Sequence, residues 1–173
     1  EKGHVGCLQL LLEAGANLEV KNDSGWTPLM IAASHGKSDC LRALLDARAD
    51  LEVKNKDGWT ALMRVAGKGH VGCLQLLLEA KSDLDVKNDS GWTPLMIAAS
   101  HGNSDCLKAL LDTDADKEAV NKDGCTALME AASNGSLDCL QLLLDAGADK
   151  EIKHEKGWTA LMSAAEKGSL ECL

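Results

Sequence analysis

Apolar and polar residues follow a short helical pattern that recurs along this chain of 173 residues. In its first full copy, residues 28–34 are mostly apolar, and the paired alanines Ala32 and Ala33 leave room for a neighbouring helix. Thr27 can accept a hydrogen bond from a free backbone N–H at a helix start, and Pro28 suits the first helical position, where no donor is needed. Gly36 can end the helix because it tolerates positive φ. The pattern predicts a short helix between Thr27 and Gly36.

A second apolar pattern follows each short helix. Cys40, Leu41, Leu44 and Leu45 have the i, i+1, i+4, i+5 spacing that places an apolar stripe on one helix face. Residues 51–59 then alternate apolar and polar side chains and contain an Asp-Gly pair, which favours an extended arm and a tight hairpin. One unit is therefore predicted to be a hairpin followed by two helices.

The unit repeats with a period of 33 residues, and residues 25–36 return unchanged at 91–102. Such a period predicts a solenoid in which each unit buries its core against its neighbours. A longer period overlies it, because residues 2–63 and 68–129 match almost throughout. We therefore predict one all-α array, an α-solenoid over residues 1–173, with a partial unit at 1–24, full units at 25–57, 58–90, 91–123 and 124–156, and a partial unit at 157–173.

The helix stops differ between the units. Gly15 and Gly147 follow the second helix at the two ends, whereas Arg48, Lys81 and Asp114 stand at the equivalent place in the middle. If the backbone turns left-handed there, each of these side chains costs on the order of 1 kcal/mol. The middle of the array is expected to be locally less stable.

The sequence of each unit resembles the ankyrin repeat. The resemblance rests on Asp-Gly-Trp-Thr-Ala-Leu-Met, followed by Ala-Ala, Leu-Leu-Leu and Gly-Ala-Asp, in five tandem phases. It implies stacked hairpin-helix-helix units that hold another protein on a concave surface of hairpin tips and first helices. The chain departs from the family pattern by placing Met where His usually follows Thr-Pro-Leu, at Met30, Met63, Met96, Met129 and Met162. We expect a buried thioether there in place of a hydrogen-bonded imidazole.

Charge and hydropathy narrow the classes of partner. The net charge of −9 argues against sequence-independent binding to nucleic acid or to an anionic membrane, which requires a basic surface. No apolar run approaches the roughly 20 residues that cross a bilayer, and no signal peptide begins the sequence. Small free thiols suit a reducing compartment, so an intracellular, most simply cytoplasmic, protein is expected. The chain starts and stops inside a unit, and we expect it to be an excerpt of a longer array.

Cysteine and histidine are the residue types in this sequence that could form disulfides or bind a metal. Equivalent cysteines recur at the repeat period, but stacked helices lie about 8–10 Å apart while bridged Cα atoms need about 7 Å, so core filling is favoured over disulfides. Cys125 replaces the hairpin Trp and is the thiol expected to be reached by reagents. His4 with Cys7 and His70 with Cys73 offer two ligands each, whereas a closed zinc site needs four. No catalytic constellation, cofactor site or metal site is predicted.

The strongest functional signal is a row of tryptophans that each follow the hairpin Gly and precede the helix-capping Thr. Two interpretations remain open: each indole packs on the next hairpin, or the row contacts a partner, for which Trp is the most enriched residue at interface hot spots. Positions beside the tryptophans on the first helices differ between units, which indicates a surface that tolerates substitution. The predicted protein-binding set is Trp26, Trp59, Trp92, Trp158, Ile31, Arg64, Ile97, Glu130, Ser163, His35, Lys68, His101, Asn134 and Lys167.

The sequence thus predicts a non-catalytic scaffold that binds another protein whose identity the residues do not reveal. A stiff stack loses little conformational entropy on binding. Two alternatives stay open: a targeting or regulatory segment of a larger enzyme such as a kinase, and a structural spacer or peripheral subunit of a large assembly.

Overall fold

The computed structural model describes residues 2–168, with side chains from residue 4 onward. Within that range the chain forms ten helices and no strand, which confirms the predicted all-α solenoid. The helices are α1 (Lys2–Glu13), α2 (Pro28–Ser34), α3 (Ser38–Asp46), α4 (Ala61–Lys68), α5 (Val71–Glu79), α6 (Pro94–Ser100), α7 (Ser104–Leu111), α8 (Ala127–Ser133), α9 (Leu137–Asp145) and α10 (Ala160–Lys167).

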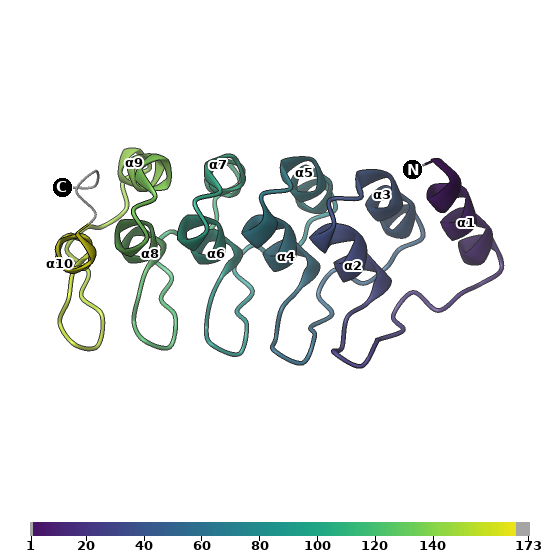
Figure 1. Cartoon of the computed structure of the whole chain (residues 1–173), viewed down its shortest axis with the longest axis horizontal. Coiled ribbons are helices and arrows are strands. Elements are labelled where there is room, and N and C mark those ends of the chain that lie inside the picture. The colour runs from purple at the N-terminus through teal and green to yellow at the C-terminus, as the bar shows by residue number, and fades with distance from the viewer. Residues whose placement is uncertain (1, 169–173) are drawn as a thin grey trace.

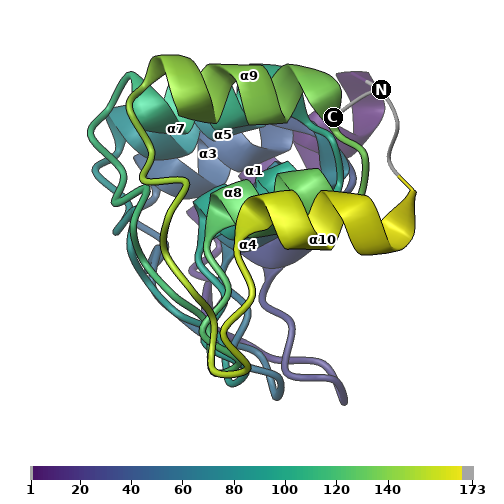
Figure 2. The same cartoon turned by 90° about the vertical axis from the view of Figure 1, so that its left-hand side faces the viewer.

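The helices lie in two rows, with the second helices α1, α3, α5, α7 and α9 above the first helices α2, α4, α6, α8 and α10 (Figure 1). Each helix packs on its neighbours within its row, and the two helices of a unit pack on each other. The loops that join successive units project from one side of the first-helix row, and the view along the stack shows them nearly superposed (Figure 2). The hairpins therefore form a second continuous surface beside the first helices.

The first helices begin as the sequence predicts. The Thr27 side chain accepts a hydrogen bond from the Met30 backbone N–H at 3.3 Å, and Thr60, Thr93 and Thr126 do the same three residues before their own Met. These four threonines are buried, so the bond satisfies a donor that water does not reach. Thr159 has the same extended backbone, and its side chain makes no capping bond.

The core lies between the two rows and runs through the stack. Met30, Met63, Met96 and Met129 are at most 3% exposed, which confirms the expected buried thioethers, whereas Met162 is 50% exposed. In the second helices Cys73, Cys106 and Cys139 are buried beside leucines and pack into the same core. Small thiols and alanines therefore set the close spacing of successive units.

Hydrogen bonds between hairpins repeat along the stack. The Asp89 backbone N–H donates to the Asp57 carbonyl at 3.3 Å, and the same bond joins the flanking hairpins. The Lys54 Nζ donates to the Lys87 carbonyl one period later, at 2.8 Å. Gly58 has φ +78°, and a Cβ there would lie 2.6 Å from the Asp89 backbone nitrogen, so a side chain would push the hairpins apart. The extended arm and tight turn predicted from the sequence are present.

The predicted left-handed turns are present after the second helices. Arg48, Lys81 and Asp114 have φ of 66°, 68° and 63°, the same region that Gly15 and Gly147 occupy. Non-glycine residues are strained in this region because Cβ approaches the following carbonyl. The units at 25–57, 58–90 and 91–123 therefore carry a backbone strain at this turn. The unit at 124–156 lacks it because Gly147 stands there.

Candidate functional site

One side chain from each hairpin forms a row along the stack, which we call the hairpin row: Trp26, Trp59, Trp92, Cys125 and Trp158. All five are half-buried. The hairpin fixes the first four through an asparagine four residues earlier, whose side-chain oxygen accepts a hydrogen bond from the row residue's backbone N–H at 2.8–3.0 Å. In the last hairpin His154 stands in that place, and its ring stacks on Trp158 with centroids 6.1 Å apart.

Arg64, on α4, lies between two members of the hairpin row. Its guanidinium carbon is 4.2 Å from the centroid of the Trp26 ring and 5.0 Å from that of Trp59, which is cation–π contact with both indoles. The Arg64 Nε is buried and has no hydrogen-bond partner within the described residues. Burial lowers the pKa of this guanidinium, while Asp57 acts in the opposite direction. The aromatic faces therefore hold the cation where few polar groups reach it.

Ile97 takes the equivalent place one unit later, and here the prediction of an exposed binding residue is wrong. The side chain is 1% exposed and clusters with Met63 and Val86, with Trp59 and Trp92 packed against the cluster. An apolar side chain fits between successive indoles and is covered by them. Ile97 therefore belongs to the packing of the row and has no surface to offer a partner.

Glu130 stands at the equivalent place on α8, one unit further on. It is half-buried, and the Asn121 side-chain amide donates to its carboxylate at 3.5 Å. Burial, and secondarily Asp123, raise its pKa to about 7. Burial together with Glu130 and Asp123 also raises the pKa of the neighbouring Cys125 thiol. Two carboxylates and a thiol thus gather where the next indole of the row would stand.

The other predicted site residues lie along the same side of the first helices. Ile31 is 41% exposed at the start of the row, and the half-buried Ser163 hydroxyl donates to the Thr159 carbonyl. His35 and His101 each place Nδ1 2.9 Å from the carbonyl four residues earlier, whereas Asn134 donates to the Glu130 carbonyl. The helix-end residues of the predicted set, His35, Lys68, His101, Asn134 and Lys167, are all exposed.

Sequence reasoning placed these residues on one side of the molecule and missed their interleaving. It treated the tryptophans and the variable first-helix residues as two separate sets. The structure alternates them, because Arg64 lies over the indole of the preceding hairpin and Ile97 has the preceding indole packed against its cluster. The available signal was the variable residue's fixed distance of five residues after each Trp.

The cysteines in the described part of the chain are free thiols. Burial raises the pKa of Cys106 and Cys139 to about 11, with a smaller contribution from the preceding aspartate in each case. The expectation that Cys125 is the most accessible thiol is wrong, because Cys125 is half-buried and Cys7 on α1 is exposed. Cys172 lies outside the described residues. Over the described range, no group of three or more His, Cys, Asp or Glu is arranged to hold a metal ion.

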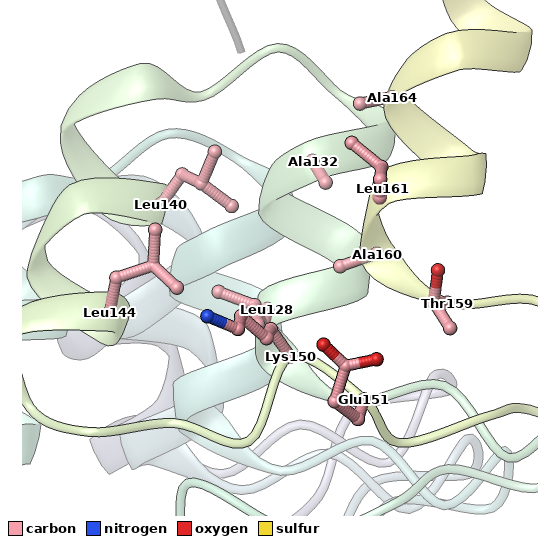
Figure 3. A pocket seen from close by; sticks show the side chains of 10 residues that line it. All are labelled: Leu128, Ala132, Leu140, Leu144, Lys150, Glu151, Thr159, Ala160, Leu161 and Ala164. Atoms are coloured by element: carbon pink, nitrogen blue, oxygen red, sulfur yellow. The ribbon is translucent and has the colours of Figure 1, made fainter. Parts of the chain in front are cut away.

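A recess of about 290 Å³ lies beside the last helices, lined mainly by leucine and alanine side chains of α8, α9 and α10 (Figure 3). Leu161 occupies the place in its unit that Leu128 occupies in the preceding one. Leu128 is 1% exposed beneath α9, whereas Leu161 is 66% exposed. The recess is therefore the place that a second helix fills in each earlier unit.

The fold and the repeated hairpins define the class of protein as a helical solenoid of hairpin-helix-helix units. A family model for ankyrin repeats (3 copies) matches residues 1–88, 44–121, 64–154 and 114–173, so the chain belongs to the ankyrin repeat family. Ankyrin repeats are in general protein–protein interaction modules and are typically non-catalytic. A search of curated proteins found no match. None of the helices between residues 2 and 168 is long and apolar enough to span a membrane.

Proposed function

We propose that the chain is a non-catalytic scaffold that binds a partner protein on the hairpin row and the neighbouring first-helix residues. The observation that carries this proposal is the row itself: four half-buried tryptophans that occupy the same position in four of five successive hairpins. Trp26, Trp59 and Trp92 use part of their surface for packing and leave the rest accessible, and Trp158 stacks on His154 of its own hairpin. Aromatic side chains held in this way bury apolar area on binding with little further loss of rotamer freedom.

The packing and the binding interpretations of the tryptophans are therefore compatible. Arg64 and Ile97 fill the spaces between the first three indoles. These contacts support a structural role for the sides of the indoles that face Arg64 and Ile97. The accessible surface beside the indoles changes from basic at Arg64 to acidic at Glu130, because Ile97 between them is buried. Specificity for a partner would come from these first-helix residues, which lie in the slots between successive members of the hairpin row, since the tryptophans themselves are nearly invariant between units.

A pull-down from native lysate tests this proposal, using the chain as bait beside a variant with Trp26, Trp92 and Trp158 changed to Ala. A matched control changes Arg42, Gln75 and Lys108 to Ala, because these are exposed residues of the second helices, away from the row. Proteins captured by the chain and by the control, but lost from the Trp variant with its helical content intact, would support the proposal. Capture that is unchanged in a folded Trp variant would refute it.

A further inference from the structure

Two slots of the hairpin row lie two 33-residue periods apart and hold different chemistry, and we call them the first and the second copy of the slot. Trp26, Arg64 and Trp59 in the first copy correspond, two 33-residue periods later, to Trp92, Glu130 and Cys125. In the first copy the slot between two indoles is filled by the chain's own guanidinium, at 4.2 Å and 5.0 Å from the ring centroids. In the second copy the cation is replaced by a carboxylate and the second indole by a small thiol.

These replacements put a carboxylate in the place of a guanidinium and a thiol in the place of an indole. A thiol has much less volume than an indole, so less side-chain bulk stands beside Glu130 than Trp59 provides beside Arg64. Asp123 is close enough to raise the pKa of Glu130 further after burial, and the described hydrogen-bond partner of the Glu130 carboxylate is an uncharged amide at 3.5 Å. A partly buried carboxylate in this position favours a cation that arrives with its own hydrogen-bond donors.

We propose that the slot formed by Trp92, Glu130 and Cys125, with Asp123 at its edge, receives an arginine side chain from the partner protein. This inference rests on the proposed function and names the chemistry that the partner presents to the row. The planar guanidinium would lie on the Trp92 ring, as Arg64 lies on Trp26, and would donate to the Glu130 carboxylate. Arginine is preferred over lysine because it combines stacking on a ring with two parallel donors toward a carboxylate.

Nuclear magnetic resonance of the ¹⁵N-labelled chain tests the slot directly, because each tryptophan gives a separate indole N–H signal. The probe is the peptide acetyl-Gly-Arg-Gly-amide, and its matched control has Gln in place of Arg. We expect the Arg peptide to shift the Trp92 signal in a saturable way, with smaller shifts at Trp26 and Trp59, whose slot Arg64 occupies. The Gln peptide should leave Trp92 unshifted.

Two variants make the test specific. Glu130→Gln keeps the shape of the side chain and should weaken binding of the Arg peptide about fivefold, the factor expected for one partly exposed charge pair. Glu130→Arg supplies the slot with an internal guanidinium, as in the first copy, and should abolish the response of Trp92. Absence of a Trp92 shift in the unchanged chain, or an equal shift in folded Glu130→Arg, would overturn the inference.

The peptide titration and the pull-down separate the two proposals. If capture of partners depends on the tryptophans but the Arg peptide does not shift Trp92, the row remains the binding surface and the arginine slot is wrong. If the Arg peptide binds as expected but the Trp variant captures the same proteins as the unchanged chain, the slot is a guanidinium site and the proposed function is wrong.

Discussion

At the scale of single residues, the Arg64 side chain contacts two successive hairpins. Its guanidinium contacts Trp26 of the preceding unit and Trp59 of its own. We expect Arg64→Ala to lower the free energy of unfolding by about 1–2 kcal/mol, through lost cation–π contact and lost packing of the side-chain stem. Urea unfolding followed by tryptophan fluorescence measures this loss. Arg42→Ala, an exposed arginine on α3, is the control and should change stability by less than about 0.5 kcal/mol.

Glu130 gives the chain a pH-dependent stability near neutrality. Its pKa is raised from 4.5 to about 7 in the folded chain, by burial and then by Asp123, so the folded state holds the proton more tightly than the unfolded state. The resulting stabilisation is fully present below pH 4.5 and is lost as the pH rises through about 7. Glu130→Gln mimics the protonated form and should remove this part of the pH dependence.

Urea unfolding at pH 5 and pH 8 tests the Glu130 prediction. Allowing for solvent screening of a half-buried group, we expect Glu130→Gln to stabilise the chain by about 1 kcal/mol at pH 8 and by much less at pH 5. Glu79→Gln changes an exposed carboxylate on α5 and provides the control. Equal changes in the free energy of unfolding at the two pH values would show that Glu130 is not the source of this pH dependence.

The residue scale is also where sequence reasoning reached its limit. The residue at position 97 differs between units, and this variability led to the prediction that Ile97 is exposed. In the structure its side chain is buried, with two indoles packed against its cluster. Whether a first-helix residue is covered depends on the bulk of the two hairpin side chains beside it, one of which belongs to the preceding unit. A reading of one unit at a time does not contain that information. Ile31, the same residue type without an indole from a preceding unit, is 41% exposed.

At the scale of elements, the turns after the second helices are strained in the middle of the array. Arg48, Lys81 and Asp114 adopt positive φ, so Arg48→Gly, Lys81→Gly and Asp114→Gly should each stabilise the chain by about 0.5–1 kcal/mol. Gly147→Ala is the matched reverse change: its φ is 77°, and an added Cβ would meet no atom within 4 Å. It should destabilise by a similar amount for conformational reasons alone. Thermal unfolding of the four variants measures both directions, and a destabilising Lys81→Gly would contradict the argument.

Sequence analysis was most successful for the elements, because their signals are local. The capping threonines, the prolines at helix starts and the left-handed stops each act through their own backbone, so one unit suffices to predict them. The bonds between units were not predicted. Lys54 reaching the carbonyl of Lys87, or the Glu52 carboxylate accepting from the Asp83 backbone N–H, depends on the distance and twist between units. Once the stack is built, the 33-residue spacing between each lysine and the carbonyl it contacts explains why the lysine recurs at the repeat period.

At the scale of the whole molecule, accessibility of the thiols reports how the stack holds together. Equivalent cysteines become more buried from the first unit inward: Cys7 is exposed, Cys40 half-buried, and Cys73, Cys106 and Cys139 are at most 2% exposed. The buried thiols also have raised pKa values, so less of the reactive thiolate is present. We expect iodoacetamide at pH 8 to modify Cys7 at least about tenfold faster than the three buried cysteines, as measured by peptide mass spectrometry.

The order of modification in urea distinguishes two ways in which the stack can unfold. Stability of a repeat array is a sum of unit terms and nearest-neighbour interfaces, and among the described helices α1 and α2 pack within their rows on one side only, on α3 and α4. Cys40 should therefore become reactive at lower urea than Cys106, with Cys73 between them, if opening proceeds inward from α1. Simultaneous exposure of all three would mean that the interfaces dominate and the array opens as one unit. Either order leaves Cys7 as the internal standard, because its exposure in the folded chain makes its rate nearly independent of unfolding.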